Sequence, residues 1–188
     1  MRPTSLLVLL PLAACHTQPV DTASPAPVGR VATQAAPRDA FAIIDSTGRR
    51  IGQVSAIETQ SGVHLEVAIT GLTPGDHGMH LHAVARCEPP AFSTATGHLN
   101  PASRQHGARN PLGAHLGDLP NLVVDQHGLG RASVIVTGVT LQPGATSIGA
   151  PGTALVIHAA PDDEVTDPTG NSGARIACAA IILPAGAP

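Results

Sequence analysis

The chain has 188 residues, of which 43% are hydrophobic and only 1% are aromatic. This length suits one well-buried domain of about 150 residues, and the near absence of aromatics means that Val, Ile, Leu and Ala must build its core. The net charge is −3 and no basic run is present, so nucleic acid is not expected as a partner.

The N-terminus has the pattern of an export signal. Arg2 precedes an apolar run at residues 6–10 and a group of small residues that ends at Cys15; the run is too short to span a bilayer. Leu12-Ala13-Ala14-Cys15 resembles a bacterial lipobox, in which cleavage precedes the cysteine and lipid is attached to its sulfur. We interpret residues 1–14 as a signal peptide and Cys15 as a lipidation site that anchors the protein to a membrane. The alternative is an ordinary signal peptide with an incidental cysteine.

Residues 15–38 follow as a segment rich in Ala, Pro, Thr, Gln and Val, without hydrophobic periodicity. Such composition is typical of a flexible tether with partly extended character. The folded domain is therefore expected to span residues 39–188.

From Ala40 onward the pattern is that of β-strands separated by turns. Residues 63–69 alternate apolar and polar side chains, as a half-buried strand does. The expected strands cover residues 41–44, 51–58, 63–69, 75–82, 119–125, 131–137, 154–158 and 175–183. With no convincing helix, this pattern predicts an all-β, immunoglobulin-like fold: an eight-stranded Greek-key sandwich or barrel with two long functional loops.

The stretch from residue 75 to residue 118 is rich in histidine. His80 and His82 are two residues apart, so on a strand both imidazoles leave the same face. A loop rich in Gly, Pro, Asn and Ser follows, and a bound metal would order a loop of this length. Its candidate ligands are His98, His106, His115 and Asp118.

Several motifs in this order make residues 40–184 resemble a copper,zinc superoxide dismutase. They are Gly-x-His-Gly-x-His-x-His at 75–82, Gly-His-Leu-Asn-Pro at 97–101, His-Leu-Gly-Asp at 115–118 and Gly-Asn-Ser-Gly-Ala-Arg-Ile-Ala-Cys at 170–178. The interval between Cys87 and His98 is longer than in animal members and resembles that of bacterial periplasmic ones.

The resemblance implies two metal cofactors that share one histidine. Four imidazoles suit Cu(II), whereas three nitrogens and one carboxylate suit Zn(II). The implied copper ligands are His80, His82, His98 and His158. The implied zinc ligands are His98, His106, His115 and Asp118. The implied activity is dismutation of superoxide anion, with His98 taking up a proton while it stays on zinc and passing that proton to the departing peroxide.

The resemblance also implies supporting residues. Asp162 corresponds to a carboxylate that links a copper histidine to a zinc histidine; the alternative is a surface aspartate in an acidic loop. Arg175 corresponds to the arginine that guides the anion to copper, and Thr169 faces it across the channel. Pro168 stands where many members carry a lysine, so we expect weaker long-range steering and less dependence on salt than in lysine-bearing relatives.

Cys87 and Cys178 correspond to the family's intradomain disulfide, which fits export to an oxidising compartment; two unpaired buried thiols are the alternative. A different class of function stays open at this point: a metal-binding module that buffers or delivers copper or zinc without turnover. The presence of His158, Asp118 and Arg175 favours the enzyme. Whether the protein is a monomer or a homodimer cannot be read from the sequence, because no interface is evident in it.

Overall fold

The structure is a computed structural model, and it describes residues 40–144 and 146–183. The expected signal peptide, the lipidation site at Cys15 and the whole of the expected tether lie outside these residues. Within them there is no helix long and apolar enough to cross a membrane.

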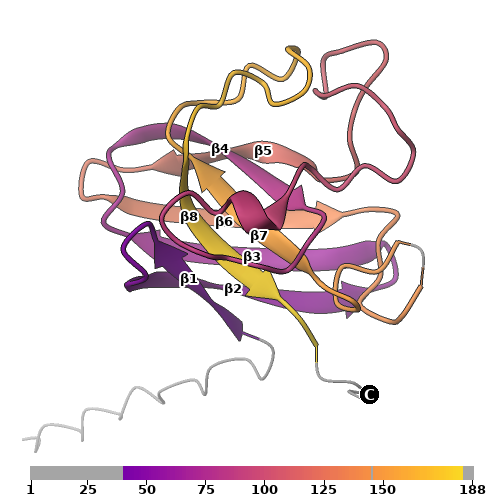
Figure 1. The fold of residues 1–188 in the computed structure, drawn as a ribbon, viewed down its shortest axis with the longest axis horizontal. Helices are drawn as coiled ribbons and strands as arrows, with labels where there is room; N and C mark the ends of the chain where they lie inside the picture. Colours follow the sequence, from indigo (N-terminus) through magenta and orange to yellow (C-terminus); the bar gives the residue numbers. More distant parts are fainter. Residues whose placement is uncertain (1–39, 145, 184–188) are drawn as a thin grey trace, which may run out of the picture. The chain divides into compact units, whose positions relative to one another are not determined.

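Eight antiparallel strands form a closed barrel in the order β1-β2-β3-β6-β5-β4-β7-β8 (Figure 1). The strands are β1 (Ala40–Asp45), β2 (Arg50–Thr59), β3 (Gly62–Thr70), β4 (Gly75–His82), β5 (Asp118–Val124), β6 (Leu129–Val136), β7 (Thr153–His158) and β8 (Arg175–Ile181). The only helical element among the described residues is a single 3₁₀ turn, η1 (Ser93–Ala95). The predicted all-β, eight-stranded architecture is confirmed.

The strand order departs from chain order where the Greek-key crossing occurs. β3 pairs with β6 rather than with β4, and β4 lies between β5 and β7. β1 pairs with β8, which closes the barrel and removes the exposed sheet edges that would otherwise pair with other chains. The crossing brings β4 and β7 together, and each of these strands carries predicted metal ligands.

The barrel interior is aliphatic, as the composition predicts. Ile43, Leu65, Met79, Leu81 and Leu155 are among the fully buried side chains. Phe92 belongs to a separate small cluster with Ala95, Val156 and Cys178, outside the barrel interior. This interior contains few polar atoms. The predicted metal ligands on β4 and β7 therefore lie on the outer face of these strands.

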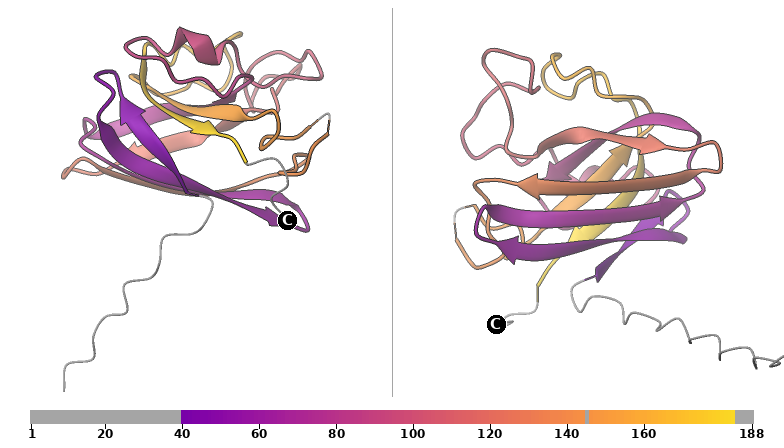
Figure 2. Two further views of the ribbon diagram at one scale, coloured as in Figure 1. Left: turned by 60° about the horizontal axis from the view of Figure 1, so that its bottom comes forward. Right: turned by 180° about the vertical axis from the view of Figure 1, so that it is seen from behind.

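Two long connections cover that outer face. Residues 83–117 link β4 to β5, and residues 159–174 link β7 to β8. Figure 2 shows parts of both beyond the same end of the barrel. They meet through hydrogen bonds from the Arg109 amide to the Glu164 carbonyl (3.0 Å) and from Asn110 Nδ2 to the Val165 carbonyl (3.2 Å).

A disulfide joins Cys87 in the first connection to Cys178 in β8, across a sequence separation of 91 residues. This confirms the predicted pairing. The bond ties the start of the long loop to a strand that the barrel already holds in place.

Replacing both Cys87 and Cys178 by serine should lower the free energy of unfolding of the metal-free domain by about 4 kcal/mol, because the unfolded chain regains the entropy of a long open loop. Urea unfolding of this variant, beside wild type in oxidised and reduced forms, measures the effect. Reduced wild type should match the variant. A difference below about 1 kcal/mol between oxidised wild type and the variant would contradict the expectation.

Candidate metal centre

The outer face of β4 presents the first two histidines. Met79 and Leu81 point into the barrel, so His80 and His82 leave the opposite face, where both are fully buried beneath the loops. β7 pairs with β4 and ends at His158, which is also buried. His77 braces this corner, because its ring nitrogens lie 2.7 Å from the His158 carbonyl and 2.9 Å from the Thr73 carbonyl.

Backbone hydrogen bonds bring the first long loop onto β4. The Leu81 amide donates to the Gly117 carbonyl, and the Leu99 amide donates to the Leu81 carbonyl. At Gly117 a Cβ would lie 2.3 Å from the Leu81 carbonyl oxygen, so only glycine permits this approach. The result is that His98 lies directly beside His82, with which it forms an isolated β-bridge.

Four histidines converge here, and each leaves one ring nitrogen without a hydrogen-bond partner in the part of the chain that the structure describes. The ligand atoms of this set all lie within 4.8 Å of one another. Buried donors and acceptors without partners are rare in folded proteins and call for an explanation. The unpartnered atoms are His80 Nδ1, His82 Nε2, His98 Nε2 and His158 Nε2. Four imidazole nitrogens turned toward one another fit a copper ion.

The opposite nitrogen of each of these rings is held in place. His82 Nδ1 donates to the Thr96 carbonyl at 2.9 Å, and His158 Nδ1 donates to the Gly173 carbonyl at 3.2 Å. His80 Nε2 donates to Asp162 Oδ2 at 2.7 Å. Such contacts determine which nitrogen is free to bind a metal and in which direction it points.

A second set of ligand atoms surrounds Asp118. Its Oδ1 lies 3.0 Å from His98 Nδ1, 3.0 Å from His106 Nδ1 and 3.2 Å from His115 Nδ1. His98 Nδ1 and His115 Nδ1 are 3.3 Å apart. A tetrahedron with zinc–nitrogen bonds of 2.0–2.1 Å has edges of about 3.3 Å. His106 Nδ1 makes no hydrogen bond despite its proximity to the carboxylate, so these four groups fit a zinc ion.

Asp162 connects the two sets. Its Oδ2 accepts from His80 Nε2, and its Oδ1 accepts from His106 Nε2 at 2.9 Å. The side chain is buried, and Gly170 packs against it so closely that a Cβ there would lie 1.8 Å from Oδ1. Asp162 is therefore not a surface aspartate of the acidic loop.

Asn121 on β5 holds the backbone of Asp162 and was not anticipated from the sequence. Its Nδ2 donates to the Asp162 carbonyl at 2.9 Å, and its Oδ1 accepts from the Asp162 amide at 2.8 Å. The only signal in the sequence is a polar residue next to the buried Leu122. These two hydrogen bonds fix the position of the second loop relative to β5.

Burial favours the neutral form of three of the clustered histidines. It is the largest influence on three of them and lowers the pKa of His82 to about 2, of His98 to about 4 and of His158 to about 3. Burial alone would raise the pKa of Asp118, but hydrogen bonds from His98 and the Gly107 amide outweigh it and hold that pKa well below its usual value. A neutral imidazole and an ionised carboxylate are the forms that bind metals.

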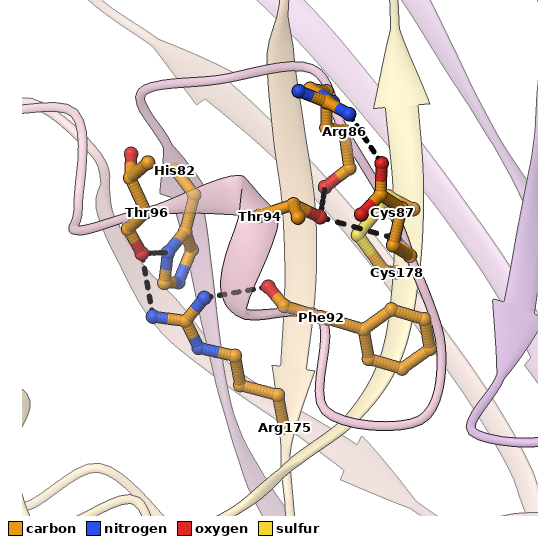
Figure 3. Close-up of a disulfide and its surroundings, with 9 residues drawn as sticks. His82, Arg86, Cys87, Phe92, Thr94, Thr96, Arg175 and Cys178 are labelled. Atoms are coloured by element: carbon orange, nitrogen blue, oxygen red, sulfur yellow. Dashed lines mark hydrogen bonds and ion pairs between the residues drawn. A yellow bond between two sulfur atoms is a disulfide. The ribbon is translucent and has the colours of Figure 1, made fainter.

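A pocket of about 360 Å³ opens beside these sets, lined by His98, His115, Thr169 and Arg175 among others. Arg175 is held by two carbonyls of the first loop: it donates to Phe92 O at 2.7 Å and to Thr96 O (Figure 3). The Thr96 carbonyl is the same one that accepts from His82 Nδ1. The arginine is thus tied to a ring of the four-histidine set through one shared acceptor.

A closed Greek-key barrel with two adjoining groups of buried metal-ligand side chains, next to a small pocket lined by an arginine, defines a protein that can hold two metal ions beside that pocket. The comparisons with known proteins agree with this class. Residues 50–181 match the profile of the copper/zinc superoxide dismutase family. A superoxide dismutase [Cu-Zn] of Aquifex aeolicus is 42% identical over 142 residues, which cover 74% of this chain and 84% of that protein.

Two solved structures extend the comparison to the fold. A superoxide dismutase-like protein from Bacillus subtilis has a TM-score of 0.73 at 33% identity, covering 76% of this chain and 97% of that one. The Cu/Zn superoxide dismutase from Brucella abortus has a TM-score of 0.62 at 28% identity, with coverage of 76% and 97%. The chain belongs to the copper/zinc superoxide dismutase family. Its activity is dismutation of superoxide, and its cofactors are copper and zinc.

Stability of the metal-free domain should fall as the pH drops from about 6.5 toward 4. In this range the unfolded chain takes up protons on His82, His98 and His158, whereas the folded site does not until the pH approaches 4. Because the state that binds more protons gains stability as the pH falls, the unfolded state is favoured. Urea unfolding of chelator-treated protein at several pH values measures the slope. Replacing His82 by Gln should flatten it, and a flat profile for wild type would contradict the assignment.

Proposed function

We propose that copper is held by His80, His82, His98 and His158, that zinc is held by His98, His106, His115 and Asp118, and that His98 therefore belongs to both sites. The proposal is supported chiefly by the unpartnered ring nitrogens of the four-histidine set, which are buried and turned toward one another. The short Asp118–histidine distances support the second set. In this scheme Asp162 orients His80 and His106 together through its two oxygens.

The reaction converts two superoxide anions and two protons into O₂ and hydrogen peroxide. Copper supplies the one-electron exchange when it is bound, and zinc, which has no redox chemistry, acts as a fixed positive charge. His98 handles the proton at Nε2, while its Nδ1 stays on the Asp118 side of the ring. Between the two half-reactions the ring holds the proton that peroxide then carries away.

Arg175 binds and orients the anion before electron transfer. Its guanidinium is held by the carbonyls of Phe92 and Thr96 and lines the pocket above His98. A fixed cation in a narrow site raises the local concentration of a small anion. Thr169 lines the same pocket and limits its width on the side of the second loop.

We place this activity in the cell envelope. The disulfide fits an oxidising compartment, and the signal-like residues 1–14 with the lipobox before Cys15 support export followed by membrane anchoring. Lipid on Cys15 would tether the domain through residues 16–38 and direct its protection toward superoxide formed outside the cytoplasm.

The purified protein should hold one copper and one zinc per chain and dismutate superoxide. Replacing Arg175 by Gln should lower kcat/KM by about tenfold, because anion attraction is lost, while metal content stays nearly unchanged; Arg175→Lys should recover part of the rate. Metal analysis and a superoxide assay on the same samples provide the measurement. Bound metal without turnover in wild type would instead favour a buffering module, and loss of both metals from the Gln variant would contradict the role of Arg175.

Anchoring can be tested with Cys15→Ser in the full-length chain expressed in a bacterium. Wild type should sediment with membranes, because several acyl chains together bind a bilayer firmly, and the variant should lose the lipid. Membrane fractionation, with mass spectrometry of the mature N-terminus, reports both. Wild type that is cleaved, unmodified and soluble would refute the lipoprotein proposal and leave the enzymatic one intact.

A further inference from the structure

The pocket above His98 contains a second arginine that the motifs do not identify. Arg104, in the first long loop, lines the same pocket of about 360 Å³ as Arg175 and Thr169. The sequence pattern suggests weak steering, because Pro168 stands where many relatives carry a lysine and the chain contains no lysine. The loop that carries His98 and His106 thus contributes a cation that this expectation did not include.

The position of Arg104 is fixed at both its backbone and its side chain. Asn100 Oδ1 accepts from the Arg104 amide at 3.0 Å, and Asn100 Nδ2 donates to the Arg104 carbonyl at 2.8 Å. The guanidinium Nη1 donates to the Gly113 carbonyl at 2.6 Å. Asn100 is the asparagine of the Gly-His-Leu-Asn-Pro motif, so the stretch that carries His98 also holds the turn that presents this arginine.

The charged residues that line the pocket have a net positive charge, which favours binding of an anion. Arg104 and Arg175 contribute two guanidinium groups, and Asp167 contributes one carboxylate. The Asp167 carboxylate is partly satisfied by the His106 amide, which donates to its Oδ1 at 2.6 Å. A small anion that enters this pocket therefore meets a net positive charge among its lining residues.

We propose that Arg104 is a steering residue for the anionic substrate. It draws superoxide and other small monovalent anions into the pocket from the side of the first long loop, and these anions then bind at Arg175. Arg104 acts through long-range attraction and touches neither metal set, so its removal should affect anion capture and leave both metals in place. This inference deepens the proposed site and rests on Arg175 lying at the substrate pocket.

The test compares Arg104→Gln with Arg131→Gln. Both remove one positive charge, but Arg131 lies on β6 and does not line the pocket. At low ionic strength Arg104→Gln should lower kcat/KM and weaken azide binding to the copper-loaded protein, followed by visible absorption, each by about two- to threefold. Arg104→Lys should restore most of both. Near 1 M salt, where the Debye length is about 3 Å, the Gln variant should approach wild type.

Several outcomes would overturn the proposal. They are an Arg104→Gln variant equal to wild type or to Arg131→Gln at low salt, a loss that persists unchanged at high salt, and a variant that loses zinc. Wild-type protein without dismutase activity would refute the proposed site itself, whereas an active wild type with an insensitive Arg104→Gln variant would refute only the steering role.

Discussion

The structure depends on five buried imidazole nitrogens that have no hydrogen-bond partner among the described residues. Leaving a polar atom buried and unpaired costs about 1–3 kcal/mol, so the metal-free fold carries a penalty that it accepts at one place. Protonation would relieve it only by placing charges close together in a dry site, and the lowered pKa values of His82, His98 and His158 show that burial opposes this. Metal ions offset the penalty directly. Binding of the metals and stability of the fold are therefore linked, and the barrel must be strong enough to hold the arrangement before the metals arrive.

That strength comes from the division between the two faces of β4 and β7. The inner face packs Met79, Leu81 and Leu155 into an aliphatic interior, while the outer face carries His80, His82 and His158. The loops are then fastened to this rigid surface from two sides. Leu81 fastens the first loop through its own amide and carbonyl, and Asn121 fastens the second by pairing with both backbone groups of Asp162. Because the Asp162 carboxylate contacts His80 and His106 at once, a shift of either loop would disturb both ligand sets.

Much of this could be predicted from the sequence, for identifiable reasons. Alternation in residues 63–69 reveals the period of two of a β-strand, and the recurring turns separate such strands, so the sequence predicts an all-β sandwich or barrel. His80 and His82 share a face for the same geometric reason. The Cys87–Cys178 pairing followed from resemblance to the family. The contact between β5 and the second loop could not be predicted, because the pairing of Asn121 with Asp162 joins residues 41 positions apart whose meeting depends on the Greek-key crossing. Arg104 gave no signal for a similar reason, since one arginine in a loop looks the same whether it faces solvent or lines a pocket.

The disulfide also does more than stabilise the barrel, because of where the chain goes after Cys87. The next turn carries Phe92 into a small cluster with Cys178 and ends at Thr96, whose φ of 64° is unusual for a β-branched residue. Backbone held in such a conformation persists only when its surroundings enforce it. Here the surroundings are the disulfide, the Phe92 contact and the two donors, His82 and Arg175, that share the Thr96 carbonyl (Figure 3). Since Cys178 and Arg175 lie on the same strand, the covalent bond and the shared carbonyl hold one segment against β8 at two points. The His82 ring and the Arg175 guanidinium are consequently positioned by one stretch of backbone, so the fold determines the distance between the proposed copper site and the proposed anion site.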